Sequence, residues 1–160
     1  MRIAVLVCLF AGLTSHAAMA ADSYREIVLQ DAPVAYWRFG ADDLGHNSAG
    51  DALIAATQGD VDVLPGPRPS ECPDFSRENT AARFSTGPNY LVVADPGEGS
   101  PLDFDNGDAL TLEAWIRFDK LSGSYPYIVG KGRTHNAGTN FRNQNYSLRL
   151  ATQGGGPFLS

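Results

Sequence analysis

The sequence at residues 110–119 reads LTLEAWIRFD and alternates apolar and polar positions. Successive side chains of a β-strand point to opposite faces, so this alternation gives one nearly apolar face. The other face carries Thr111, Glu113, Trp115, Arg117 and Asp119. We therefore predict a central strand here, whose core-facing side chains are Leu112, Ala114 and Ile116.

Shorter apolar runs surround this segment, and many of the 17 Gly and 10 Pro residues fall between them. This punctuation is typical of strands joined by turns. A short helix is expected at residues 24–29, with Ser23 as its cap. The Gly-Pro-Asn turn at residues 87–89 favours a hairpin between the runs on its two sides. The further strands are expected at residues 35–39, 52–57, 61–64, 81–85, 90–94, 127–129 and 146–150.

The spacing of these strands, with no crossover helix between them, predicts an all-β protein, a two-sheet antiparallel sandwich. The sequence after the glycines at residues 154–156 resembles the start of another strand. We therefore expect the sandwich to be incomplete and residues 21–160 to form part of one domain. A chain cut there would fold poorly alone, because interior strand edges would lack partners.

The first residues predict export. Arg2 precedes an apolar run over residues 3–13, and Ala18-Met19-Ala20 forms a small-x-small cleavage site. Residues 1–20 therefore read as a signal peptide, since the run is shorter than the ~20 residues that span a bilayer. The expected location is secreted, periplasmic or at the cell surface, with no membrane span after cleavage. The net charge of −6 argues against nucleic acid as a partner.

Five motifs, in order along the chain, resemble one family. They are DAPVAYWRFG at residues 31–40, AARF with YLVV at 81–84 and 90–93, LTLEAWI at 110–116, YIVGKG at 127–132 and NYSL at 145–148. Together they resemble the laminin-G-like modules of the concanavalin A-like lectin/glucanase superfamily. The resemblance implies a jelly-roll sandwich. It also implies later strands, including one of the form W-H-H-V-A, that this sequence does not contain.

The candidate chemistry is sparse. Glucan-cleaving enzymes that share this fold carry paired carboxylates on one strand face, whereas Glu113 has only Thr111 and Trp115 at the neighbouring same-face positions. We therefore expect no enzymatic activity. Asp103, Asp105 and Asp108 are candidate calcium ligands, but a solvated turn explains the same residues. Calcium is the only cofactor that the sequence suggests.

An amide-rich segment at residues 136–145 is the strongest binding candidate, because amides and aromatic rings suit sugar hydroxyls and sugar faces. The expected function is a non-catalytic recognition module that binds a glycan or an extracellular protein through loops of the sandwich. Two alternatives stay open: an accessory part of a secreted glycoside hydrolase or other enzyme, and a structural or adhesion spacer. The candidate ligand-binding residues are Tyr125, Tyr127, Asn140, Arg142 and Asn143.

Overall fold

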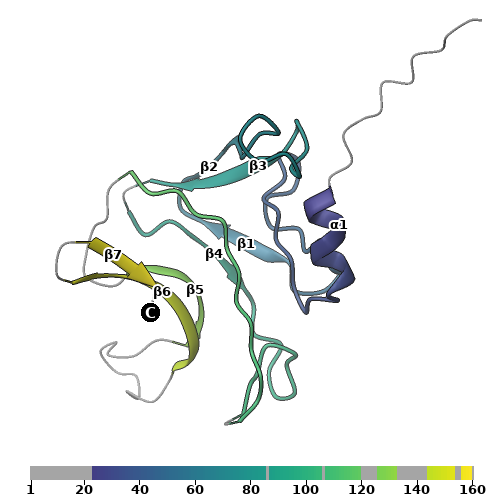
Figure 1. The fold of residues 1–160 in the computed structure, drawn as a ribbon. Coiled ribbons are helices and arrows are strands. Elements are labelled where there is room, and N and C mark those ends of the chain that lie inside the picture. The colour runs from purple at the N-terminus through teal and green to yellow at the C-terminus, as the bar shows by residue number, and fades with distance from the viewer. Residues whose placement is uncertain are drawn as a thin grey trace, which may run out of the picture. The chain divides into compact units, whose positions relative to one another are not determined.

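The structure is a computed structural model that describes residues 23–159, apart from residues 86, 106, 120–125, 133–143 and 154–155 (Figure 1). The expected signal peptide at residues 1–20 lies outside this part. The described chain is mostly β, as predicted, and every strand pairing is antiparallel. Its elements are α1 (Ser23–Gln30), β1 (Ala55–Gln58), β2 (Val61–Pro65), β3 (Thr80–Phe84), β4 (Tyr90–Val93), β5 (Tyr127–Gly132), β6 (Gln144–Gln153) and β7 (Gly156–Leu159).

Internal contacts divide the chain into two compact units, Met1–Ala94 and Asp95–Ser160. The first unit holds α1 and two small sheets, one of β1 with β4 and one of β2 with β3. The second holds a sheet in the order β5-β6-β7. In the described part of the chain, no helix has the length and apolar character that a bilayer crossing requires.

The predicted helix at residues 24–29 is confirmed as α1. Near its start, the Tyr24 backbone N–H donates to the carbonyl of Asp74 at 3.1 Å. The Tyr24 ring stacks on Phe75, with ring centroids 4.7 Å apart. Phe75 is one of two buried apolar side chains among the described residues; the other is Leu150 in β6. An aromatic contact and a backbone hydrogen bond therefore link the start of the helix to residues 74 and 75.

The hairpin predicted around residues 87–89 is wrong. β3 pairs with β2 and β4 pairs with β1, so the two runs flanking that turn enter different sheets. The reason lies in Asn89, whose Oδ1 accepts the backbone N–H of Asp60 at 2.9 Å. This bond ties the β3–β4 connection to the β1–β2 connection. Asp62 and Arg83, opposite each other in the β2–β3 register, form an ion pair at 2.6 Å.

The strand predicted at residues 35–39 is also wrong, because this segment makes only an isolated bridge between Trp37 and Asn47. Phe39 has a φ of 57°, which turns the chain out of the extended conformation. The indole of Trp37 donates to the carbonyl of Leu53 at 2.9 Å. The backbone N–H of Tyr36 donates to a side chain, Oδ1 of Asn47, at 2.8 Å. These side-chain bonds accompany one backbone bond, from the N–H of Ser48 to the carbonyl of Tyr36 at 2.7 Å, and no continuous ladder forms along residues 35–39.

The central strand predicted at residues 110–119 is absent. Residues 109–118 belong to no strand, and Ala114 and Ile116, expected in the core, are exposed. A β-strand is defined by its ladder of hydrogen bonds to a neighbour, and no strand of the described chain pairs with this segment. Alternation can therefore predict which side chains share a face, but not whether a partner strand is available.

The three-stranded sheet of the second unit confirms the predicted strands at residues 127–129 and 146–150, and β7 confirms the expected strand after the glycines. Lys131 of β5 lies opposite Tyr146 of β6. Beside this pair, a Cβ at Gly130 would lie 2.9 Å from the carbonyl oxygen of Tyr146. Glycine therefore allows β5 to approach β6 at the point from which the Lys131 and Tyr146 side chains leave the sheet.

Candidate functional site

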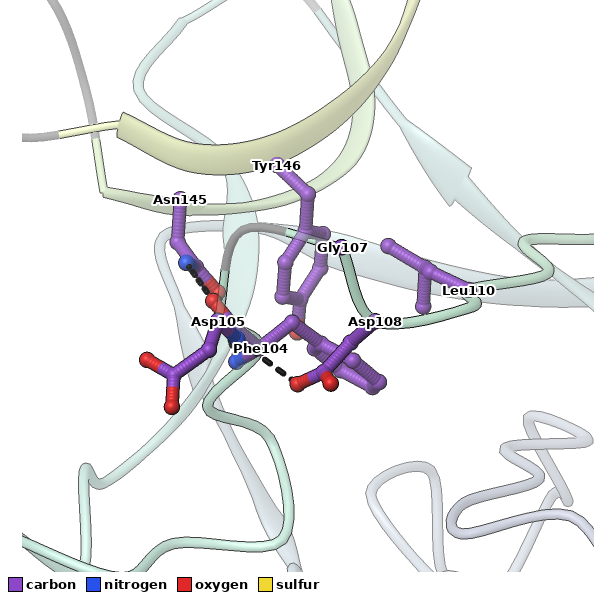
Figure 2. Close-up of a pocket in the computed structure, with 7 residues that line it drawn as sticks. All are labelled: Phe104, Asp105, Gly107, Asp108, Leu110, Asn145 and Tyr146. Carbon is purple, nitrogen blue, oxygen red and sulfur yellow. Dashed lines mark hydrogen bonds between the residues drawn. The ribbon is translucent and has the colours of Figure 1, made fainter.

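A pocket of about 380 Å³ lies in the second unit (Figure 2). One wall is the turn that precedes residues 109–118, and the other is the beginning of β6. Aromatic, amide and carboxylate side chains line it together. The lining residues are Phe104, Asp105, Gly107, Asp108, Leu110, Asn145 and Tyr146.

The turn wall is held by its own polar groups. The backbone N–H of Asp105 donates to Oδ2 of Asp108 at 2.8 Å, and the N–H of Asp108 donates to the carbonyl of Asp105 at 3.1 Å. Gly107 has a φ of 106°, a conformation that side chains other than glycine rarely adopt. These bonds and this glycine give the turn that the sequence predicted at residues 103–108, and they point the Asp105 and Asp108 carboxylates in different directions (Figure 2).

Asn145 joins the turn to β6 through a reciprocal pair of hydrogen bonds. Its Oδ1 accepts the backbone N–H of Phe104 at 3.2 Å, and its Nδ2 donates to the carbonyl of Phe104 at 2.7 Å. The amide thus satisfies both polar groups of one residue, as a neighbouring strand would. The rings of Phe104 and Tyr146 meet edge to face, with centroids 5.5 Å apart and planes at 84°. The two walls are therefore fixed by polar and aromatic contacts.

An ionic network lies next to the pocket, on β5. The Lys131 ammonium forms an ion pair with Asp103 and lies 3.4 Å from a carboxylate oxygen of Asp95. Only 22% of the Lys131 side chain is exposed. Asp95 also accepts the backbone N–H of Gly97 at 3.0 Å. Lys131 therefore connects the segment before the turn to the sheet and compensates part of its negative charge.

The pKa values of Lys131, Asp95 and the neighbouring Tyr146 are shifted from their ordinary values. The bond to Asp103, with help from Asp95, raises the pKa of Lys131 above its ordinary value of 10.5. The Gly97 backbone N–H, and secondarily Lys131, lowers the pKa of Asp95 below 3.8. Burial raises the pKa of the Tyr146 hydroxyl above 10.0; the charge of Lys131 opposes this shift, and the charge of Asp103 adds to it. These shifts favour the ammonium form of Lys131, the carboxylate form of Asp95 and the neutral phenol of Tyr146.

We expect the second unit to lose stability in alkali. Because the Lys131 pKa is raised on folding, its contribution is complete below pH 10.5 and is lost as the pH rises through the folded-state value. The raised Tyr146 pKa acts in the same direction above pH 10.0. Asp95, with its lowered pKa, contributes above pH 3.8 and loses its effect as the pH falls through its folded-state value. The midpoint of urea unfolding should therefore be constant near neutral pH and should decrease both in acid and in alkali.

The matched variants for this test are Lys131→Met and Tyr146→Phe, which keep the apolar part of each side chain and remove the titrating group. The double variant should show a shallower decline of the urea midpoint above pH 10 than the parent chain. An unchanged alkaline decline in the double variant would contradict the assignment.

The candidate ligand residues from the sequence fall mostly outside this site. Tyr127 lies in β5, with the guanidinium carbon of Arg149 5.5 Å from its ring centroid, and it does not line the pocket. The other four candidates lie outside the described residues: Tyr125, Asn140, Arg142 and Asn143.

The candidate calcium ligands do not come together as a metal site. Asp103 pairs with Lys131, Asp108 accepts a bond within the turn, and Asp105 points elsewhere (Figure 2). Within the part of the chain that the structure describes, no group of three or more His, Cys, Asp or Glu side chains has the proximity that a metal ion needs.

The sequence analysis included Asn145 only as the last residue of the amide-rich segment and did not name it among the candidate ligand-binding residues. It placed Tyr146 only in a predicted strand and gave Lys131 no role. The available signal was their position directly after a polar loop, at the start of a strand, where side chains commonly line binding sites.

Comparison of the chain with models of protein families, with curated protein sequences and with solved structures finds no match.

Proposed function

We propose that this chain is a non-catalytic recognition module of an exported protein, with a two-sheet jelly roll of the laminin-G-like kind, and that it binds carbohydrate in the pocket of the second unit. The antiparallel pairings and the ordered motifs support the fold. The pocket lining is the observation that supports carbohydrate as the ligand. Two aromatic rings there lie next to two carboxylates and an amide: Phe104, Tyr146, Asp105, Asp108 and Asn145.

The charge of the pocket selects among ligands. Asp105 and Asp108 line it, and the cation beside it, Lys131, is engaged by Asp103 and Asp95. A phosphate, sulfate or carboxylate group would meet negative charge there. A neutral sugar would not, and its hydroxyls suit carboxylate acceptors while its apolar face suits an aromatic ring. The lining thus favours a neutral oligosaccharide over an anionic one.

We propose that the chain is not catalytic because it lacks, around Glu113, the pair of carboxyl groups that glycosidases use. Their two carboxyl groups flank the scissile bond at a defined separation, ~5 Å in retaining and ~6.5–9.5 Å in inverting enzymes. Glu113 has Thr111 and Trp115 as its same-face neighbours, so no second carboxylate lies at the adjacent positions of that face. Glu113 is also exposed and does not line the pocket. Binding without turnover is the activity that these residues support.

A glycan array tests this proposal. The full chain should bind neutral oligosaccharides and give no signal above background with their sulfated or sialylated counterparts. Asp105→Asn and Asp108→Asn remove charge from the pocket while keeping an acceptor oxygen, and each should weaken binding of the selected neutral glycan about tenfold, the effect of losing one charge-assisted hydrogen bond. The matched control is Asp51→Asn, an exposed aspartate of the first unit, which should bind as the parent does.

The same glycans should remain intact after prolonged incubation with the chain. Hydrolysis that Glu113→Gln abolishes, in a protein that still folds, would overturn the non-catalytic part of the proposal. Equal binding by the Asp105, Asp108 and Asp51 variants would overturn the assignment of the pocket.

A further inference from the structure

Acidic side chains give the pocket of the second unit an excess of negative charge. Two of its lining residues are Asp105 and Asp108, and none of the described lining residues carries a positive charge. Lys131, on β5, is already paired with Asp103 and Asp95. Because opposite charges attract more strongly where water is partly displaced, a ligand gains affinity by bringing positive charge into this pocket.

The two pocket carboxylates keep oxygen atoms that a ligand can use. Oδ2 of Asp108 accepts the backbone N–H of Asp105 at 2.8 Å. The Asp105 carboxylate points away from Asp108, and no described residue donates a hydrogen bond to it (Figure 2). Hydrogen bonds from an ammonium group to a carboxylate are about twice as strong as those between neutral groups. The free oxygens therefore favour an ammonium donor over a hydroxyl donor.

Two aromatic rings complete the lining. Phe104 and Tyr146 meet edge to face, with centroids 5.5 Å apart and planes at 84°. In this arrangement the ring that presents its edge has neither of its faces covered by the other ring. A ring face attracts the apolar face of a sugar, and it also attracts a cation. Rings and carboxylates together are the groups that a sugar bearing an ammonium requires.

The second unit already holds one ammonium group with carboxylates of the same segment. The Lys131 ammonium is paired with Asp103 and lies 3.4 Å from a carboxylate oxygen of Asp95. The bond to Asp103 raises the pKa of Lys131 above 10.5, so the negative charge of this segment stabilises an ammonium. Asp105 and Asp108 take no part in that interaction and can bind a second ammonium group.

We propose that the ligand of this pocket is an oligosaccharide of amino sugars whose amino groups are free rather than acetylated. This rests on the proposed carbohydrate recognition by the pocket and adds the charge of the ligand. The Asp105 and Asp108 carboxylates bind the sugar ammonium, and the apolar face of the sugar packs on an aromatic ring of the lining. N-acetylation removes the positive charge but keeps the sugar face, so it weakens binding without abolishing it.

Calorimetric titration of the full chain with matched tetrasaccharides tests the charge of the ligand. The probes are the chitosan tetramer, made of glucosamine, the chitin tetramer, made of N-acetylglucosamine, and cellotetraose, made of glucose. At about pH 6, where amines are protonated, the chitosan tetramer should bind about tenfold more tightly than the other two. This preference should shrink between about 50 mM and 500 mM salt, because salt screens exposed charges.

Removal of the two pocket charges tests the site. In the double variant with Asp105→Asn and Asp108→Asn, the chitosan tetramer and cellotetraose should bind equally, because the acceptor oxygens stay and the charges are lost. The matched control is Glu98→Gln, which removes an exposed carboxylate of the same unit outside the pocket lining and should keep the preference. If the double variant is insoluble, Asp105→Asn alone should reduce the preference to about threefold.

The outcomes separate this inference from carbohydrate recognition itself. Binding of cellotetraose with no tighter binding of the chitosan tetramer would overturn the amino-sugar assignment and leave carbohydrate recognition standing, whereas no binding of any tetramer would overturn both. A preference that persists in the double variant would contradict the roles of Asp105 and Asp108. A trilysine peptide that binds as tightly as the chitosan tetramer would also overturn the assignment, because positive charge alone would then explain the affinity.

Discussion

Replacing Asn47 by alanine should cost the first unit most of its stability. Asn47 is 2% exposed. Its Oδ1 accepts the backbone N–H of Tyr36 at 2.8 Å and of Ala49 at 3.1 Å, and its Nδ2 donates to the carbonyl of Ala52 at 2.9 Å. Alanine would leave these groups without their partner, at about 1–3 kcal/mol for each one that stays buried. A domain's whole stability is only about 5–15 kcal/mol.

The matched control is Asn89→Ala. Its amide also makes three hydrogen bonds, to Asp60 and twice to Ser85, but at a site exposed to water. Water can replace these bonds, so the urea midpoint should fall much less than in Asn47→Ala. If Asn47→Ala does not yield soluble protein, the comparison moves to Asn47→Ser, which should lie between the two. Equal midpoints for Asn47→Ala and Asn89→Ala would contradict the role of burial.

Gly45→Ala is expected to disrupt the approach of β1 to the preceding loop. A Cβ at residue 45 would lie 1.8 Å from the carbonyl oxygen of Ala55, which is backbone and therefore has little freedom to move. The same two residues are joined by the hydrogen bond from the Ala55 N–H to the Gly45 carbonyl, at 2.9 Å. One methyl group would separate them, and we expect a loss of at least about 3 kcal/mol.

Gly50→Ala provides the comparison for this methyl group. Gly50 lies in the same loop, and a Cβ there would meet no atom within 4 Å. Its urea midpoint should stay within experimental error of the parent value or rise slightly, because alanine restricts the unfolded chain more than glycine does. A Gly45→Ala protein as stable as Gly50→Ala would show that the loop and β1 do not approach as described.

The sequence predicted the short strands well where turn residues bound them closely. The run at residues 61–64 lies between Gly59 and Pro65, and it is found as β2 with one residue added. The strand predicted from the strongest alternation, at residues 110–119, is absent. A strand also needs a partner, and none of the described strands pairs with this segment. The prediction of a hairpin at residues 87–89 was wrong because the Asn89 side chain accepts a hydrogen bond from the Asp60 backbone. This contact spans 29 positions, and no local pattern contains it.

The site was predicted only in part. The acidic turn was recognised, but Asp103 was grouped with Asp105 and Asp108 as a calcium candidate, whereas it pairs with Lys131, 28 positions later. The bond of Asn145 to Phe104 spans 41 positions. Local spacing cannot reveal such pairs, because they depend on how β5 and β6 bring distant segments together.

The most direct test of carbohydrate recognition is a titration of the ¹⁵N-labelled full chain with the neutral oligosaccharide that gives the strongest array signal, followed through backbone amide chemical shifts. We predict saturable shifts concentrated at Asp105, Asp108, Asn145 and Tyr146, which line the pocket. Residues of β2 and β3, in the first unit, should stay unchanged. Saturable shifts confined to the first unit, or binding with no change at the four pocket residues, would contradict carbohydrate recognition in this pocket.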